Sequence, residues 1–329
     1  MPALNLKPML ATLSDAAAHR DAPEWDLEFK WDGFRGLVHW NMRSFHLVTR
    51  NGLDMTQRFA PLRALAGQLS HPMVLDGEVV ALDAHGVPRF GALQHWRPGQ
   101  PLALYLFDIL QHGSTSLLER GYDERRAILE ALALEGEHWR VPARFSGGVR
   151  EHLEVARAHQ LEGLVAKRRA SPYQPGRRSA DWLKFKLVNR QEFVVCGFTP
   201  GVEPRSIGSL LLGYRFHGSW RFAGGMGTGF TLAQRREFHS VLRMLSTAHS
   251  PIQAAVPGRV TAQWVTPRIV VEVEHRGWTD QGLLRVPSFV GIRIDTAAEE
   301  VRRERPRAWP VRAASRPAPR PRSRSTGSR

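Results

Sequence analysis

Lys30-Trp31-Asp32-Gly33-Phe34-Arg35 places an amine, a carboxylate and a guanidinium within six positions, with a glycine among them. A lysine amine can attack phosphorus, but only after it has lost its proton. Its ordinary pKa is about 10.4, so it needs desolvation or neighbouring cations to become a nucleophile near neutral pH. Taken alone, the hexapeptide is equally consistent with a cluster of surface charges at a strand end.

The composition excludes several classes of protein. The chain has 329 residues, enough for two domains, and its 42% hydrophobic and 23% charged residues are ordinary for a soluble globular protein. No apolar run approaches the roughly 20 residues that cross a bilayer, and the N-terminus lacks a signal-peptide pattern. Cys196 is the one cysteine, which excludes an intrachain disulfide and a cysteine-based zinc site. We therefore expect a cytoplasmic protein.

The positive charge is concentrated at the C-terminus. Residues 301–329 hold ten arginines and one acid, Glu304, and so carry +9 of the total net charge of +15. This segment is rich in proline and serine and poor in large apolar residues, which predicts an unfolded tail. A flexible cationic arm suits a polyanion such as a nucleic acid, although a solvated extension with no specific role is the alternative.

The hydrophobic pattern predicts an α+β protein with two folded parts. In residues 1–188, alternating apolar residues indicate strands at 28–31, 35–40, 45–49, 74–75 and 102–107, with helices at 125–134 and 149–159. In residues 189–300, short strands at 193–198, 210–214, 220–223 and 269–273 surround one helix at 232–245. Several short strands and one helix are typical of a small closed β-barrel such as an OB-fold.

Five further polar clusters follow the hexapeptide in order. Each alone has an ordinary explanation, such as a turn, a hairpin end, a core aromatic or the solvent face of a strand. Lys184 and Lys186 lie two apart on a predicted strand, so their side chains share one face. The clusters occupy residues 49–52, 75–78, 105–108, 162–167 and 182–186.

The ordered set resembles the covalent nucleotidyltransferase superfamily, which comprises DNA ligases, RNA ligases and mRNA capping enzymes. It is most similar to bacterial ATP-dependent DNA ligases of the end-joining type. The resemblance covers about residues 5–296 and includes the stretches 7–11, 171–178 and 287–291. It implies a nucleotidyltransferase domain of mixed antiparallel sheets with flanking helices over 1–188, an OB-fold over 189–300 and a basic tail over 301–329.

The resemblance also implies roles for individual residues. Lys30 is expected to attack the α-phosphate of ATP, expel pyrophosphate and hold AMP. Asp32 orients or activates the site, and Arg35 contacts the nucleotide or the DNA 5′-phosphate. Lys184 and Lys186 grip the α-phosphate. The remaining expected ligands of the nucleotide are Glu28, Arg50 (phosphate), Glu78 (ribose), Phe107 (adenine stacking), Glu162, Arg177, Arg293 and Asp295.

The implied chemistry depends on charge. Phosphoryl transfer needs positioning and charge neutralisation, and Arg35, Lys184 and Lys186 supply cations that we expect to lower the pKa of Lys30. Glu78 and Glu162 are expected to place Mg²⁺ or Mn²⁺, hard ions that prefer carboxylate and phosphate oxygens.

One position departs from the family pattern. The last motif of the family is usually Arg-x-Asp-Lys, and this sequence has Arg293-Ile294-Asp295-Thr296. The missing lysine predicts either slow self-adenylylation or compensation by a nearby cation such as Arg302.

Two other functions stay open. An RNA ligase or capping guanylyltransferase shares the motifs, and label from GTP alone on Lys30 favours capping. A non-catalytic DNA-binding scaffold is the alternative from another class, favoured by Thr296 and the basic tail. For the ligase we expect a monomer acting on nicked double-stranded DNA and associated with the nucleoid. Ku-type proteins and a polymerase are conceivable partners, which no residue identifies.

Overall fold

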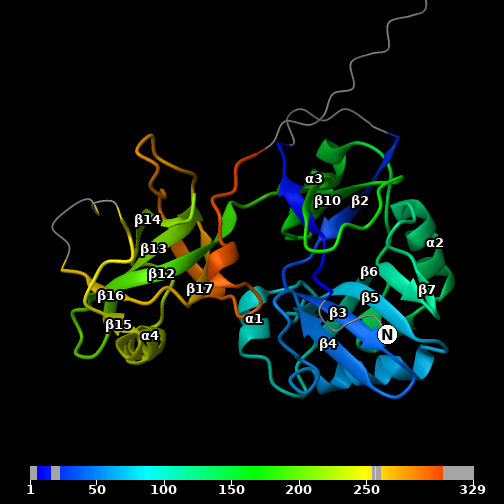
Figure 1. Ribbon diagram of the computed structural model, residues 1–329, viewed down its shortest axis with the longest axis horizontal. Coiled ribbons are helices and arrows are strands. Elements are labelled where there is room, and N and C mark those ends of the chain that lie inside the picture. Colours follow the sequence, from blue (N-terminus) through cyan, green and yellow to red (C-terminus); the bar gives the residue numbers. More distant parts are fainter. Residues whose placement is uncertain (1–5, 16–22, 254–255, 257–260, 307–329) are drawn as a thin grey trace, which may run out of the picture.

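The computed structural model describes residues 6–15, 23–253, 256 and 261–306, and these form two lobes (Figure 1). Strands up to Lys186 build the first lobe, and strands from Arg190 onward build the second. The rest of the predicted tail, residues 307–329, lies outside the described residues. Among the described helices, none has the length and apolar composition needed to cross a membrane.

A four-stranded sheet in the first domain carries the strand that ends in Lys30. β1 and β11 are parallel, and the other neighbours are antiparallel. One face packs on α3 (Val149–Ala158), where Leu153 meets Leu164 and Phe185 in a buried cluster. The strand order is β1 (Leu10–Leu13), β11 (Arg178–Lys186), β10 (Gly163–Arg168) and β2 (Trp25–Lys30).

A larger sheet forms the rest of this domain. Its core includes residues from η2 (Ala60–Gln68) and α1 (Phe90–Gln94), while α2 (Tyr122–Ala131) packs on β6. The strand order is β4 (Phe45–Thr49), β3 (Phe34–Trp40), β5 (Met73–Ala81), β6 (Leu102–His112), β9 (Trp139–Arg140) and β8 (Glu135–Gly136), with β7 (Thr115–Ser116) paired to β6.

The hexapeptide connects the two sheets of the first domain. β2 in the smaller sheet ends at Lys30, and β3 in the larger sheet begins at Phe34. A Cβ atom at Gly33 would lie 2.1 Å from the carbonyl oxygen of Val79, so the connection passes too close to β5 for a larger residue. Met9, Leu37 and Trp182 fill a small shared core, and each is almost fully buried.

The second domain is a strongly bent sheet. Thr228, two residues beyond the end of β14, forms an isolated parallel bridge with Ser288 of β18, and the sheet surrounds one apolar core. A bent sheet of short strands with one helix agrees with the OB-type architecture that the sequence predicts. The main path is β14 (Ser219–Met226), β13 (Ile207–Phe216), β12 (Arg190–Pro200), β16 (Gln263–Val265) and β15 (Ser246–Thr247), with β17 (Val270–Glu274) joining β12 to β18 (Ser288–Ile292).

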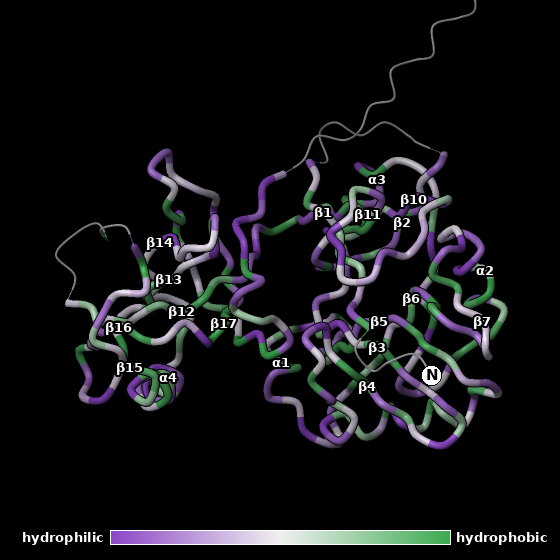
Figure 2. Tube along the Cα trace, in the orientation of Figure 1, coloured by the Kyte–Doolittle hydropathy of each residue, from purple (hydrophilic) through white to green (hydrophobic). Residues whose placement is uncertain are grey.

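One helix, α4 (Leu232–Met244), covers an end of this core. Thr231 and Gln234 form a capping box, in which each side chain bonds the backbone amide of the other. Phe238 and Leu242 are buried, whereas Met244 is exposed. The amphipathic pattern is visible along the trace in Figure 2, where apolar and polar residues alternate on the elements of both domains.

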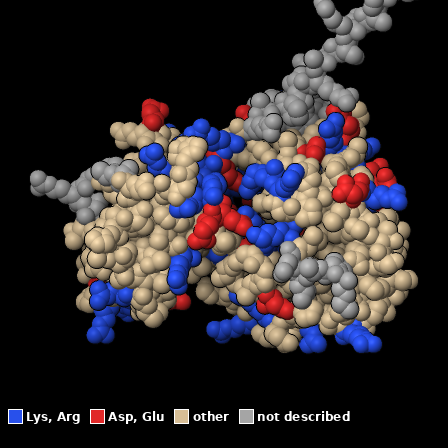
Figure 3. Space-filling model, in the orientation of Figure 1, with Lys and Arg blue, Asp and Glu red and all other residues tan. Residues whose placement is uncertain are grey.

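Polar contacts join the two domains around the site, and Val290 and Ile294 of the second domain also pack against the apolar core of the first. Arg190 donates to Asp32 over 2.9 Å, and Asn51 donates to the carbonyl of Ile294 over 3.0 Å. The Gln94 amide also donates to the carbonyl of Ile292. Figure 3 shows acidic and basic side chains gathered between the lobes. Such contacts can be exchanged for others when a charged ligand enters.

The chain remains ordered past residue 300. η3 (Ala298–Glu300) is followed by Val301, which is 2% exposed and packs with Val194 and Val270. The prediction of an unfolded tail from residue 301 is therefore wrong for residues 301–306. The composition argument averaged over 29 residues and missed the apolar anchor at its start.

Candidate functional site

Lys30 is the last residue of β2, and its amine forms an ion pair with Glu162, which immediately precedes β10. The lysine side chain is 23% exposed and that of Glu162 is 5% exposed. Gly163 follows Glu162, and a Cβ atom there would lie 1.9 Å from the carbonyl oxygen of Phe185, so glycine is needed where β10 begins beside β11. The amine is thus fixed at the rim of the first domain, facing the second.

The prediction that cations lower the pKa of Lys30 is wrong for this arrangement. Burial acts to lower this pKa, but the negative charges of Glu162 and Glu78 outweigh it, so the pKa lies above its ordinary value. Lys184 and Lys186 instead pair with Glu304. Lys30 is therefore held as an ammonium and becomes a nucleophile only when the charge of Glu162 is engaged elsewhere.

A cavity of about 160 Å³ opens beside Lys30. Phe107 and Trp182 supply aromatic walls, and charged side chains supply the rest. The cavity contains most of the predicted nucleotide ligands: its lining includes Glu28, Lys30, Arg35, Arg50, Glu78, Phe107, Lys184, Arg293 and Asp295.

Two cationic side chains make cation–π contacts with the Phe107 ring. The Arg35 guanidinium lies 4.5 Å from the ring centroid, and the Lys167 amine lies 4.4 Å from it. Lys167 also lies 4.4 Å from the centroid of the Trp182 ring. A flat, electron-rich pocket bordered by cations suits a nucleobase attached to phosphates.

Glu28 is held from several sides at the bottom of this cavity. Its carboxylate accepts from the Tyr122 hydroxyl and pairs with Lys167 over 2.7 Å. Burial lowers the pKa of Lys167 although Glu28 acts in the opposite direction. Glu28 therefore organises the cavity wall as well as facing its interior.

Arg35 is fixed by a bidentate pair. Its guanidinium donates to both carboxylate oxygens of Asp76, over 2.5 and 2.6 Å, and Asp76 is completely buried. The Tyr173 hydroxyl donates to the same carboxylate over 2.6 Å. This geometry holds the arginine rigidly against the aromatic wall.

Lys184 and Lys186 do share one face of β11, as the strand period predicted. Lys184 lies 2.5 Å from one oxygen of Glu304, and Lys186 lies 3.2 Å from the other. Burial lowers the pKa of Lys184 to about 8, partly offset by Glu304. Neutral-pH conditions still leave this amine mostly charged and ready to receive an anion.

Glu78 lies on β5 facing Lys30 and the second domain. Burial raises its pKa to about 8, against the opposing effect of Lys30 and Arg35. Its side chain and those of Glu162 and Lys30 border one small cavity between the domains. Glu78 and Glu162, the two predicted metal ligands, therefore border the same cavity.

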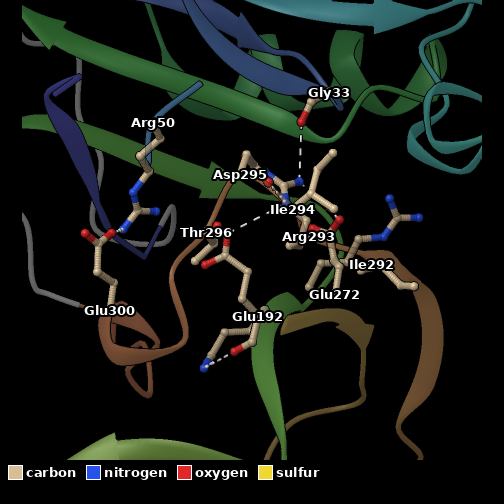
Figure 4. A network of polar contacts seen from close by, with 12 residues as sticks. Gly33, Arg50, Glu192, Glu272, Ile292, Arg293, Ile294, Asp295, Thr296 and Glu300 are labelled. Carbon is tan, nitrogen blue, oxygen red and sulfur yellow. Dashed lines mark hydrogen bonds and ion pairs between the residues drawn. The ribbon is translucent and has the colours of Figure 1, made fainter. Parts of the chain in front are cut away.

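The segment around Arg293 extends from the second domain toward the first (Figure 4). Arg293 donates to Asp295 over 2.7 and 2.9 Å, and to the carbonyl of Gly33 over 3.3 Å. Glu272 lies 3.4 Å from the same guanidinium. Thr296 is 5% exposed and donates to Glu192 over 3.2 Å. Arg293 thus bridges to the hexapeptide itself.

Two arginines predicted to bind the nucleotide, Arg50 and Arg177, differ in their position. Arg50 lines the cavity, and its guanidinium lies 2.8 Å from Glu300. Arg177 is exposed and is not part of the cavity lining, whereas its neighbour Arg178 is. The structure therefore does not bring Arg177 to the site: β11 begins at Arg178, which is also exposed but borders the cavity.

Comparison with known proteins decides the family. Residues 8–186 match the model of the "ATP dependent DNA ligase domain", and residues 203–296 match that of the "ATP dependent DNA ligase C terminal region". The chain belongs to the ATP-dependent DNA ligase family.

Curated relatives include the multifunctional non-homologous end joining proteins LigD of Mycolicibacterium smegmatis and Pseudomonas aeruginosa. The first is 41% identical over 300 residues, 89% of this chain and 39% of that protein, and the second is 40% identical over 309 residues, 90% and 36%. The chain thus spans about two fifths of the length of these relatives. A probable DNA ligase of Anaeromyxobacter dehalogenans is 33% identical over 88% of this chain and 58% of its own length.

Solved structures agree with the sequence matches. A mycobacterial DNA ligase D complexed with ATP and MES superposes with a TM-score of 0.66 at 39% identity, covering 92% of this chain and all of that one. The ligase domain of Mycobacterium tuberculosis LigD has a TM-score of 0.54 at the same identity and coverage.

The residues of this ligase-family site offer two carboxylates to the expected divalent ion. Within the part of the chain that the structure describes, no group of three or more His, Cys, Asp or Glu side chains is placed to hold a metal ion. Glu78 and Glu162 nevertheless border one cavity. Mg²⁺ commonly takes one or two carboxylates together with water and substrate phosphates, so this donor set fits.

Several residues of this ligase-family site were not among those predicted from the sequence. Lys167 and Asp76 lie inside clusters that the sequence did identify, so their signal was present. Arg190 and Glu192 follow directly on the last cluster, at the start of β12. Glu304 had no local signal, because its importance depends on contacts with lysines more than 100 positions away.

Proposed function

We propose that this chain is an ATP-dependent DNA ligase that seals nicks between a 5′-phosphate and a 3′-hydroxyl. The observation that carries this proposal is the position of Lys30. Its amine lies where the aromatic cavity, the carboxylate pair and the face of the second domain meet. The family membership and the LigD relatives support the same reaction.

In the first step, the Lys30 nitrogen forms a bond to the α-phosphorus of ATP while the bond to pyrophosphate breaks. The ammonium must first lose its proton, which passes to solvent at this partly exposed amine, so Glu162 has to stop stabilising the charged form. Lys184 and Lys186 offset the negative charge that develops on the phosphoryl oxygens. Arg293, reaching across to Gly33, approaches the departing pyrophosphate from the second domain. A divalent ion at Glu78 and Glu162 would supply further charge neutralisation when bound.

In the later steps, AMP passes to the DNA 5′-phosphate and the 3′-hydroxyl then displaces it. A cleft of about 580 Å³ between the domains includes Lys30, Arg89, Arg157 and Arg190 among its lining residues. These arginines suit the phosphates of the broken strand. We infer that the duplex lies across this cleft with both domains around it.

The test is a nick-sealing assay combined with mass spectrometry. Protein incubated with ATP and magnesium should gain one AMP on Lys30 and should seal a 5′-phosphorylated nick with ATP but not with NAD. Lys30→Ala should lose the adduct and the sealing, by at least about 10³-fold, while keeping some sealing of a nick that is already adenylylated. Lys7→Ala, in which an exposed lysine is removed, is the matched control and should keep the adduct.

Other outcomes of the same assay support other functions. An adduct formed from GTP alone would favour a capping enzyme, and sealing confined to RNA nicks would favour an RNA ligase. Absence of any adduct on Lys30 would overturn the ligase proposal in favour of a non-catalytic scaffold.

The names of the LigD relatives describe multifunctional end-joining proteins, and we extend this setting to the chain. On this proposal it works as a monomer on nicked DNA, in the cytoplasm and close to the nucleoid. Ku-type and polymerase partners follow from the same setting, and magnesium or manganese is the expected ion.

A further inference from the structure

The segment that follows the last matched family residue is built into the second domain. The family match ends at residue 296, yet Val301 is buried against Val194, Val270 and Ala298. The carbonyl of Val301 accepts from the backbone amide of Arg215 over 2.8 Å. Residues 301–304 therefore have a fixed course from the second domain toward the first.

Gln191 holds this segment by two hydrogen bonds. Its amide nitrogen donates to the carbonyl of Arg302 over 3.0 Å, and its amide oxygen accepts from the backbone amide of Glu304 over 3.1 Å. Gln191 is 6% exposed. The next side chain along, that of Arg303, stacks on Trp278 at 4.0 Å. The backbone of Glu304 is thus placed by its neighbours and not by its own carboxylate alone.

The Glu304 carboxylate lies among three cations of the first domain. One oxygen is 2.5 Å from the Lys184 amine and 3.7 Å from Arg178, and the other is 3.2 Å from the Lys186 amine. The glutamate side chain is 17% exposed, and both lysines are less exposed than that. Lys184, Lys186 and Arg178 hold the pKa of Glu304 well below its usual range.

A carboxylate in this position resembles a bound phosphate. Both groups present oxygens that accept charge-assisted hydrogen bonds from the same amines. Glu304 borders the nucleotide cavity, the small cavity around Lys30 and a third cavity lined by Arg50, Arg178 and Arg302. An incoming triphosphate has to pass this carboxylate to reach Lys184 and Lys186.

We propose that Glu304 is an internal phosphate mimic: it occupies the phosphate lysines in the nucleotide-free protein and has to leave before ATP can bind productively. This inference rests on the proposed ligase function. The carboxylate competes with the nucleotide for Lys184 and Lys186, and so it raises the ATP concentration at which enzyme-AMP forms. It also holds the second domain against the first when no nucleotide is present.

A static structural role predicts the opposite behaviour. If Glu304 served to position the lysines for catalysis, its removal would slow adenylylation at every ATP concentration. If it competes with phosphate, its removal lowers the KM for ATP and leaves the rate at saturating ATP unchanged. The two roles are therefore separated by how KM and kcat respond.

The test compares the full chain with Glu304→Gln, which removes the charge and keeps the size of the side chain. Initial rates of enzyme-AMP formation, measured against ATP concentration, should give a KM at least about fivefold lower with kcat unchanged. Glu299→Gln is the matched control, because Glu299 is an exposed glutamate in η3, five residues before Glu304. Circular dichroism checks that both variants are folded. An unchanged or higher KM, or a lower kcat, would overturn the proposal.

A binding measurement separates this inference from the ligase function. An ATP analogue with a methylene group between the α- and β-phosphates cannot transfer AMP, and calorimetry should find it bound at least about fivefold more tightly by Glu304→Gln. If Glu304→Gln binds the analogue more tightly but neither protein forms an adduct with ATP, the role of Glu304 is supported and the ligase function is rejected. If the adduct forms but the variant binds the analogue no more tightly, the ligase function is supported and the role of Glu304 is rejected.

Discussion

The charges of the first domain and those of the C-terminal segment 292–304 are paired in different ways. Arg35 pairs with Asp76, and Lys167 pairs with Glu28, within a single domain and largely buried. Arg293 and Glu304, by contrast, reach across the domain boundary to the Gly33 carbonyl and to two lysines. One set of contacts belongs to the fold, and the other can form and break with the position of the second domain.

The difference explains how one site can act in several steps. A rigid nucleotide cavity needs buried, bidentate pairs that keep their geometry with or without ligand. A cover that releases pyrophosphate and then admits DNA needs contacts that a competing anion can replace. Substitutions in the first set should affect stability, and substitutions in the second should affect individual reaction steps.

The largest expected effect is from Arg293→Ala. Removing this guanidinium should slow enzyme-AMP formation by about 10²–10³-fold, because it reaches the hexapeptide only from the closed second domain. Sealing of a pre-adenylylated nick should change far less. Rapid-quench assays of the two steps measure this separation, with the exposed Arg285→Ala as control. Equal loss in both steps would place Arg293 with the structural pairs instead.

Asp76→Ala tests the structural set. It leaves Arg35 buried with no carboxylate and deprives the Tyr173 hydroxyl of its acceptor. We expect the free energy of unfolding of the first domain to fall by on the order of 3 kcal/mol, measured by urea denaturation. Glu154→Ala, which removes an exposed partner of Arg157, should change the midpoint little. A small effect of Asp76→Ala would remove the contrast between the two sets.

Glu272 provides a pH-dependent test on the second-domain side. Burial raises its pKa to about 7 against the opposing charge of Arg293. The folded protein therefore keeps a proton that the unfolded chain has released, and this stabilisation, full below about pH 4.5, is lost as the pH rises through 7.

Glu272→Gln should flatten that loss, because glutamine does not titrate. The Tm of the variant minus the Tm of the parent protein should therefore increase between pH 5 and pH 8. The increase should correspond to on the order of 1–3 kcal/mol in the free energy of unfolding. Thermal unfolding at four pH values measures it. A Tm difference that is constant with pH would show that Glu272 does not titrate in this range.

Local pattern predicted the parts of the site that depend on one strand or one turn. Lys184 and Lys186 share a face because the strand period is two. The charge state of Lys30 was predicted with the wrong sign, because it depends on Glu162, 132 positions away in the sequence. The register of β11 decided between Arg177 and Arg178, and single-sequence pattern does not fix strand register.

The C-terminal segment was predicted least well. Its arginine- and proline-rich composition indicates an unfolded chain, and this average hides Val301, a single apolar residue with a pocket to fill. Once Val301 is anchored, Glu304 follows at a fixed distance and meets the lysines. Composition indicates whether a segment can form an apolar core by itself. It does not show whether the rest of the fold has a pocket that buries one of its residues.

The substitution at Thr296 has the smallest expected effect on the reaction rate. The family pattern has a lysine here, whereas the Thr296 hydroxyl donates to Glu192 (Figure 4). Arg302 is poorly placed to replace the missing lysine charge, because its guanidinium donates to the backbone carbonyls of Glu299 and Val301. Thr296→Lys should therefore speed enzyme-AMP formation severalfold, about 1 kcal/mol of barrier, measured with labelled ATP.

The control Thr296→Val removes the hydrogen bond to Glu192 without adding charge. If the valine variant is as fast as the lysine variant, the gain comes from releasing Glu192 and not from the new cation. If neither variant changes the rate, position 296 imposes no deficit, and the exchangeable contacts at Arg293 and Glu304 suffice to handle the pyrophosphate. If the site lacks one cation, only the lysine variant should form enzyme-AMP severalfold faster. The reason is that a positive charge near the phosphate acts mainly on the negative charge that develops in the transition state.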